Sequence, residues 1–135
     1  MTSNVQLENF AKNHKFKNFR GVIFRNEFNT LHPLRQECGI YGSKDNTQDN
    51  MHWCAWYKDG DYAYCFDSFG LEPTKEIIKY LRKSIKVGNI KYSTFQIQKF
   101  SEDLCGEYCL YFLDEMNKKK KFVDVILNLV KDNTY

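Results

Sequence analysis

The sequence predicts a globular protein built from both helices and strands, and three observations carry this prediction. Two aromatic-rich runs, 51–57 and 61–66, flank an Asp-Gly pair, which is a strong hairpin signal. Isoleucine and leucine side chains recur at helical spacing over 77–85. With 42% hydrophobic and 27% charged residues, the composition is too apolar for a disordered chain and too charged for a membrane protein. From the length of 135 residues we expect a single domain, 1–135.

The net charge and the number of cysteines limit the possible functions but do not identify one. Twenty Lys and Arg against 17 Asp and Glu give a net charge of +3, which permits nucleic-acid contact without demanding it. The first residues lack the pattern of a secretory signal, and no run approaches the roughly 18 apolar residues of a membrane span. Five cysteines, an odd number, argue against a secreted disulfide scaffold. We therefore expect a reducing compartment, with neither secretion nor a membrane.

The N-terminal part of the chain predicts one helix and two extended segments. Apolar residues at roughly helical spacing predict a short helix over 5–14. The segment 21–28 is expected to be extended, and 37–42 is expected to form a second strand. The run 43–50 is rich in Asn, Asp, Ser and Gln, which is typical of a loop.

The hairpin brings residues with useful chemistry together. With the Asp-Gly pair at 59–60 as the two central turn residues, His52 lies opposite Asp67, and Cys54 lies opposite Cys65. Because side chains alternate along a strand, all four share one face, with opposed Cβ atoms about 4.5–5.5 Å apart. A one-residue bulge would break this register.

The second half of the chain predicts two longer helices, a strand and a final helix. These elements are a helix with Pro73 in its first turn, a strand over 90–100, a helix from Asp103 and a mostly buried helix over 122–131. Four lysines at 118–121 interrupt the apolar pattern, and we interpret them as a solvated break between helices, with weak nucleic-acid contact as the alternative.

Cys105 is the cysteine best placed for chemistry. It falls in the first turn of the helix from Asp103, where the positive end of the helix dipole and free backbone N–H groups favour a thiolate. The alternative is a small core residue, because Cys105 lies on the apolar stripe and cysteine is among the most buried residue types. Glu102 and Asp103 oppose thiolate formation unless they point away.

His52 and Asp67 supply the base that such a nucleophile needs. A cysteine nucleophile requires a base within hydrogen-bond reach, and that base requires a partner that orients it. Structural strand residues remain the alternative interpretation. A zinc site is disfavoured because His52, Cys54, Cys65 and Asp67 share a face without paired C-x-x-C spacing.

Four short motifs together resemble the adenovirus protease (adenain) family of cysteine endopeptidases, found in adenoviruses, virophages and polinton-like elements. They are Met-His-Trp at 51–53, Phe-Asp-Ser-Phe-Gly at 66–70, Ile-Gln at 97–98 and Leu-Cys-Gly-Glu-Tyr-Cys at 104–109. The resemblance covers 19–116. The order His, acid, Gln, Cys is reversed from the papain order, in which Cys precedes His.

This resemblance implies a role for each matching residue. It implies that His52 is the general base, Asp67 its orienting carboxylate, Gln98 the oxyanion-hole side chain and Cys105 the nucleophile. Gln96 competes with Gln98, but its spacing to the cysteine does not fit the family. The implied fold is α+β, with a mixed central β-sheet flanked by helices and the nucleophile at a helix N-terminus, as in the adenovirus and ubiquitin-like-protein proteases.

The chain departs from the adenoviral pattern in ways that bear on cofactors. Asp67 stands where adenoviral members carry Glu, a change common in ubiquitin-like-protein proteases. No cysteine lies between Gly70 and Gln98 to match the one that links the adenoviral activating peptide. We expect no cofactor to be required for the chemistry and no metal; DNA or an activating peptide enters only by family analogy.

The resemblance also implies a biological role. We expect polypeptide substrates, namely capsid or core precursors cleaved during virion maturation, and a monomer located in the virion and the host-cell cytoplasm or nucleus. Two alternatives stay open. One is a protease that removes ubiquitin-like modifiers, and the other is a catalytically silent homologue that serves as a virion structural or binding component.

Overall fold

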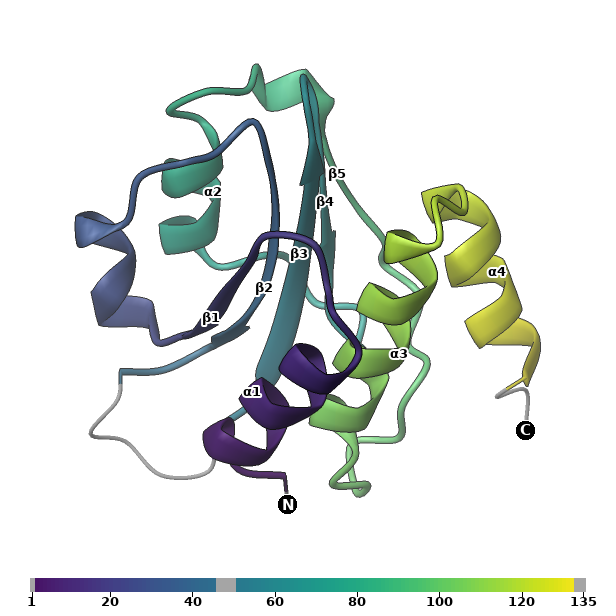
Figure 1. Ribbon diagram of the computed structural model, residues 1–135. Coiled ribbons are helices and arrows are strands. Elements are labelled where there is room, and N and C mark those ends of the chain that lie inside the picture. The colour runs from purple at the N-terminus through teal and green to yellow at the C-terminus, as the bar shows by residue number, and fades with distance from the viewer. Residues whose placement is uncertain (1, 46–50, 133–135) are drawn as a thin grey trace.

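The computed structural model describes residues 2–45 and 51–132 and shows an α+β fold (Figure 1). The elements in chain order are α1 (Asn4–Asn13), β1 (Phe19–Ile23), the 3-10 helix η1 (Arg25–Thr30), β2 (Gln36–Gly42), β3 (Trp53–Asp59), β4 (Tyr62–Phe66), α2 (Lys75–Leu81), the 3-10 helix η2 (Val87–Asn89), β5 (Ile90–Tyr92), α3 (Cys105–Asn117) and α4 (Phe122–Asp132). The strands form one sheet in the order β1-β2-β3-β4-β5. The two outer pairs are parallel and the two inner pairs antiparallel, so the expected mixed sheet is confirmed.

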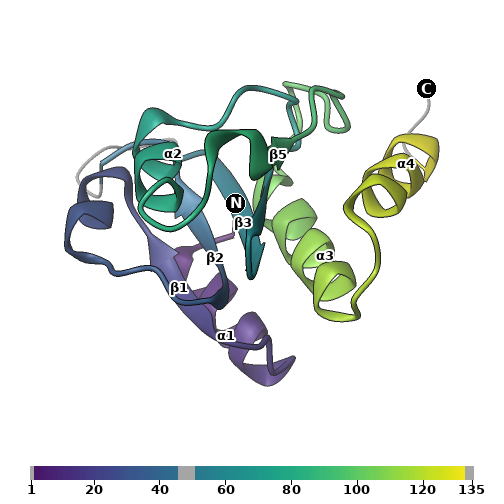
Figure 2. The same cartoon turned by 90° about the horizontal axis from the view of Figure 1, so that it is seen from above.

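Helices cover both faces of the sheet. Seen from above, α2 lies on one side of the strands, and α3 lies on the other, with α4 beyond it (Figure 2). Alternating side chains of β3 feed two separate apolar cores. Trp53 and Ala55 belong to the core beneath α1 and α3, whereas Cys54 and Trp56 belong to the core beneath α2. Among the described helices, none has the length and apolar character needed to cross a membrane.

The hairpin is present, but its predicted register is wrong. Trp56, not Cys54, pairs with Cys65, because the central turn residues are Gly60 and Asp61. Gly60 has a φ of +66°, which suits the first central position of a type II′ turn. The Asp-Gly signal therefore located the turn one residue too early. Continued by one pair, the observed register places Asp67 across from Cys54 and puts His52 on the diagonal instead of directly opposite.

Three further expectations need correction. The extended segment 21–28 is instead β1 followed by η1. The strand over 90–100 stops at Tyr92; in the irregular segment that follows, the backbone N–H groups of Ile97 and Gln98 donate to the carbonyl of Ser68 and not to a neighbouring strand. Pro73 precedes helix α2, because Thr74 is its N-cap.

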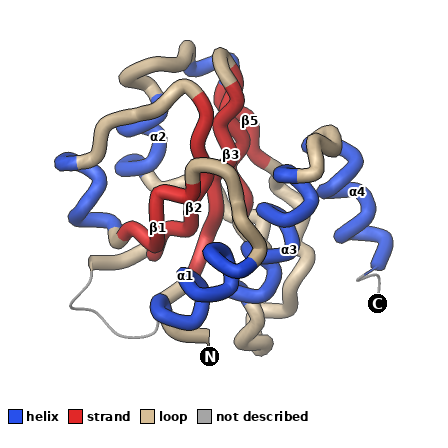
Figure 3. The backbone as a smooth tube through the Cα atoms, in the orientation of Figure 1, coloured by secondary structure: helices blue, strands red, loops and turns tan. Residues whose placement is uncertain are grey.

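The remaining elements agree with the prediction. Helix α1, strand β2 and helices α3 and α4 lie where the sequence placed them, as the tube in Figure 3 shows. Of the predicted loop 43–50, residues 46–50 lie outside the described residues. Three of the four lysines between α3 and α4 form ion pairs with acidic side chains. Lys118 contacts Asp114 and Glu115, Lys120 contacts Glu115, and Lys119 contacts Asp59. This pairing favours the solvated-break interpretation.

Candidate active site

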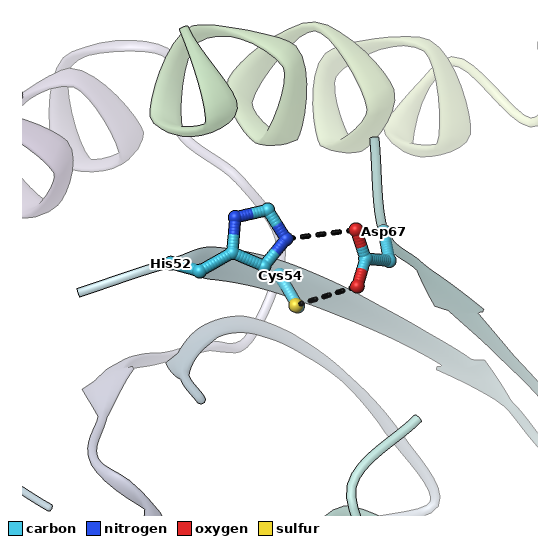
Figure 4. Close-up of side chains that lie close together, drawn as sticks. All are labelled: His52, Cys54 and Asp67. Carbon is cyan, nitrogen blue, oxygen red and sulfur yellow. Dashed lines mark hydrogen bonds and ion pairs between the residues drawn. The ribbon is translucent and has the colours of Figure 1, made fainter. Parts of the chain in front are cut away.

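His52 and Asp67 meet at one end of the central hairpin. His52 directly precedes β3, and Asp67 directly follows β4. The Nε2 atom of His52 lies 2.8 Å from Oδ1 of Asp67 (Figure 4). Phe69 stacks on the imidazole, with ring centroids 4.4 Å apart and planes inclined by 10°. The ring is thus fixed at one edge by a carboxylate and across one face by an aromatic side chain.

Cys105 lies in the first turn of α3, as its periodicity predicted, and is the first residue of a helix that begins two residues after the expected Asp103. Its Sγ atom accepts a hydrogen bond from the backbone N–H of Trp53 at 3.4 Å. The N-cap residue of the helix is Leu104, whose side chain makes no capping hydrogen bond. A Cβ on the next residue, Gly106, would lie 3.1 Å from Leu7, so glycine lets helix α1 approach the start of α3 closely.

The surroundings of His52 favour its protonated form. Burial lowers the pKa of His52, but hydrogen bonds and charge interactions with Asp67 and Cys105 outweigh burial and raise the pKa to about 9. Nε2 of His52 contacts Asp67, and Figure 4 shows the other ring nitrogen, Nδ1, on the side of the ring away from Asp67. The imidazole is thus held at Nε2 by a carboxylate whose negative charge favours the protonated ring.

The four residues that follow β4, 67–70, make separate contacts that shape the site. Asp67 accepts a hydrogen bond from the backbone N–H of Phe69 at 2.8 Å, which closes a tight turn around the carboxylate. Ser68 accepts two backbone N–H groups and donates its hydroxyl to Gln98 at 2.5 Å. Gly70 has a φ of +75°, and a Cβ there would lie 2.7 Å from the backbone of Phe95. The motif positions the acid, the ring stack and the glutamine segment together.

We expect Gly70→Ala to destabilise the fold by about 2 kcal/mol or more, because a left-handed residue gains a Cβ that meets backbone. Urea unfolding followed by circular dichroism measures the change. Gly88→Ala is the matched control, since nothing lies within 4 Å of a Cβ built there. Equal unfolding free energies for the two variants would contradict the account of this turn.

Gln98 is buried and firmly held. Its Nε2 donates to the backbone carbonyl of Glu102 at 2.7 Å, and its Oε1 accepts from the Ser68 hydroxyl. A carbonyl can only accept, so these two contacts fix the orientation of the amide. Within residues 2–45 and 51–132, the second N–H of Nε2 has no hydrogen-bond acceptor. The competing residue Gln96 is exposed. Gln98 is thus tied both to the Asp67 turn and to the segment that leads into α3.

Cys54 is a neighbour of the site that sequence reasoning treated only as a small strand residue. Its Sγ lies 3.6 Å from Oδ2 of Asp67, the carboxylate oxygen that His52 does not contact (Figure 4). Donor atoms of His52, Cys54 and Asp67 all lie within 4.8 Å of one another, so three of the four residues weighed for zinc do gather. Burial and the Asp67 charge raise the pKa of the Cys54 thiol well above its usual range, which favours a hydrogen-bonding thiol over a thiolate ligand.

Phe69 is the other site residue whose contact sequence reasoning missed. Its position two residues after Asp67 belongs to the Phe-Asp-Ser-Phe-Gly motif, but its stacking on His52 depends on the turn that the Asp67 carboxylate closes. Aromatic residues are frequent throughout this chain, so composition offers no signal that separates Phe69 from core packing.

Comparison with known proteins finds similarity in the fold only. No protein-family model and no curated protein matches the sequence. A crystal structure of ASFV pS273R protease matches with a TM-score of 0.60 at 16% identity, covering 91% of this chain and 58% of that one. The selenomethionine form of the same protease matches with a TM-score of 0.67 at 15% identity, covering 93% and 61%. The chain thus has the fold of a protease structure, and spans about three fifths of its length.

Proposed function

We propose that the protein is a cysteine endopeptidase in which Cys105 is the nucleophile, His52 the general base and acid, and Asp67 the residue that orients His52. The observation that carries this proposal is the 2.8 Å contact between His52 and Asp67, beside a Cys105 sulfur that accepts the backbone N–H of Trp53, the residue next to His52. A cysteine, a base and an orienting acid in contact are the minimum that thiol-based acyl transfer requires. The fold likeness to ASFV pS273R protease and the motif resemblance to the adenovirus protease family support it.

The proposed reaction begins with His52 protonated and Cys105 deprotonated. With His52 as an imidazolium, the Cys105 thiolate attacks the scissile carbonyl carbon, and a C–S bond forms while an electron pair moves to oxygen. Collapse of the tetrahedral intermediate breaks the C–N bond, and His52 donates its proton to the leaving amine. His52 then takes a proton from water, whose oxygen attacks the thioester. The C–S bond breaks, the acid product leaves, and the thiolate–imidazolium pair is restored.

The developing oxyanion needs donors, and two are proposed. The backbone N–H of Cys105 lies in the first turn of α3, and the second N–H of the Gln98 amide is oriented by the two contacts that hold this side chain. Such preorganised donors are usually a large part of catalysis in acyl transfer. All proton and electron-pair movements use these side chains and water, so no cofactor is required for the chemical steps.

Gln98→Ala is expected to lower kcat about 10²–10³-fold if Gln98 is an oxyanion donor. Steady-state kinetics on a cleaved peptide measure the loss. Gln96→Ala is the control, because the Gln96 side chain is exposed and contacts the site only through the Gln98 carbonyl. A loss below threefold in Gln98→Ala would exclude the oxyanion role.

We infer that the substrates are polypeptides, and that capsid or core precursors in virion maturation are the class to try first. The adenovirus protease resemblance and the fold shared with a protease of a virus support this choice. The proposal includes a monomer acting in the virion and in the host-cell cytoplasm or nucleus. DNA and an activating peptide are additives to test in the assay, by family analogy.

A thiol-reactive electrophile tests the proposal without any knowledge of the substrate. Iodoacetamide should modify Cys105 faster in the wild-type protein than in His52→Ala at pH 6, as quantified by mass spectrometry of the peptide that contains Cys105. A silent homologue without a functional His–Cys pair would show equal rates in the two proteins, and that result would contradict the proposed function.

A further inference from the structure

The buried carboxylate of Asp67 has two oxygens with different partners. Oδ1 receives the His52 ring and the backbone N–H of Phe69, each at 2.8 Å. Within the described part of the chain, Oδ2 has one hydrogen-bond donor, the thiol of Cys54 at 3.6 Å. The Asp67 side chain is only 8% exposed, so water is largely excluded from both oxygens. An ionised oxygen in such a place is costly unless a donor pairs with it.

The surroundings of Cys54 keep its thiol protonated, so that it can donate a hydrogen bond. It lies in β3 across from the end of β4, in the core beneath α2, and is buried. Burial and the negative charge of Asp67 both raise the pKa of its thiol, so it stays protonated at neutral pH. An ionised carboxylate only accepts hydrogen bonds, so the direction of the contact is from the Cys54 thiol to Asp67.

We propose that Cys54 is a positioning residue of the site: its S–H holds Oδ2 of Asp67 and thereby fixes the carboxylate plane so that Oδ1 meets Nε2 of His52. This inference rests on the proposed function and deepens it. Without a donor on Oδ2, the carboxylate is held through Oδ1 alone. It can then turn further about its Cβ–Cγ bond, and the imidazole loses part of its orientation toward Cys105. Cys54 touches neither substrate nor the reacting atoms, so it acts only through Asp67.

The test compares two substitutions at Cys54 with the same substitutions at Cys65. Cys54→Ala removes the donor, whereas Cys54→Ser keeps an O–H donor in its place. Cys65 is a buried cysteine in the same core, paired with Trp56, and makes no contact with Asp67, so Cys65→Ala and Cys65→Ser are matched controls. Cys54→Val, which fills the volume of the thiol without donating, replaces Cys54→Ala if the alanine variant fails to fold.

We expect Cys54→Ala to lower kcat by roughly threefold to tenfold at unchanged KM, the range of one hydrogen bond of ordinary net strength. Cys54→Ser should recover most of the loss, and both Cys65 variants should match the wild type. The proton NMR signal of the hydrogen-bonded His52 Nε2–H should move in Cys54→Ala alone. If Cys54→Ser falls as far as Cys54→Ala, or if Cys54→Ala equals Cys65→Ala, the role is packing and the proposal is wrong.

The alkylation rate of Cys105 by iodoacetamide is the second readout, and it needs no substrate. A slower rate in Cys54→Ala than in Cys65→Ala supports the positioning role even if no peptide is ever cleaved. Equal rates in these two variants, alongside normal peptide cleavage by the wild type, would refute the role of Cys54 and leave the proposed function standing.

Discussion

Cys105→Ala is expected to abolish peptide cleavage while leaving the fold intact. The substitution removes the sulfur that would form the acyl-enzyme, and Cys105 is the cysteine that lies at the start of α3. Removal of a nucleophile from a catalytic triad typically costs several orders of magnitude in rate. The measurement is mass-spectrometric detection of new peptide termini after incubation with a proteome-derived peptide library.

Cys65→Ala serves as the control for this substitution, since it also removes one buried thiol but lies away from the site. It should cleave at the wild-type rate. Circular dichroism and urea unfolding should show that Cys105→Ala is folded. Cleavage retained at the wild-type rate in folded Cys105→Ala would reassign the nucleophile.

Asp67→Asn is expected to lower kcat by about 10³–10⁴-fold. An amide in place of the carboxylate can present its N–H to the imidazole, which favours the wrong tautomer and removes the negative charge that stabilises the imidazolium. Steady-state kinetics measure the loss, and Asp61→Asn, at an exposed turn position, is the control. A loss below about tenfold would contradict the orienting role of Asp67.

The same substitution makes a prediction about stability and pH. Asp67 helps to raise the pKa of His52 from 6.5 to about 9. Because the folded-state pKa is the higher one, the ion pair contributes stability that is fully present below pH 6.5 and is lost as the pH rises through 9. The difference in unfolding free energy between wild type and Asp67→Asn should therefore be largest below pH 6.5 and smallest above pH 9. A difference that grows with pH would contradict this assignment.

Much of the site could be predicted because its residues lie at the ends of well-patterned elements. The apolar stripe of α3 placed Cys105 at the helix start, where the structure has it. His52 and Asp67 meet although the predicted register is wrong. In the observed register they are diagonal neighbours instead of directly opposed residues, and diagonal side chains still lie within reach of each other. Local pattern therefore predicted the proximity of these residues and missed their geometry.

The parts that could not be predicted depend on contacts between distant segments. The segment after β5 has an alternating pattern, but it leaves the sheet because the backbone of Gln98 bonds to Ser68, 30 residues earlier. The contact of Cys54 with Asp67 required the true register, since the predicted one set Cys54 against Cys65. Gln98 entered as a candidate only through the motif resemblance, because an isolated glutamine carries no pattern of its own.

The most direct test of the central claim is active-site labelling with a substrate-derived electrophile. A peptide that the protein cleaves is remade with a chloromethyl ketone at the scissile carbonyl, and the modified residue is located by tandem mass spectrometry. Cys105 as the nucleophile predicts one adduct per molecule, on the sulfur of Cys105, with loss of activity in proportion to labelling. An adduct on any other residue, or continued cleavage by protein fully labelled at Cys105, would contradict it.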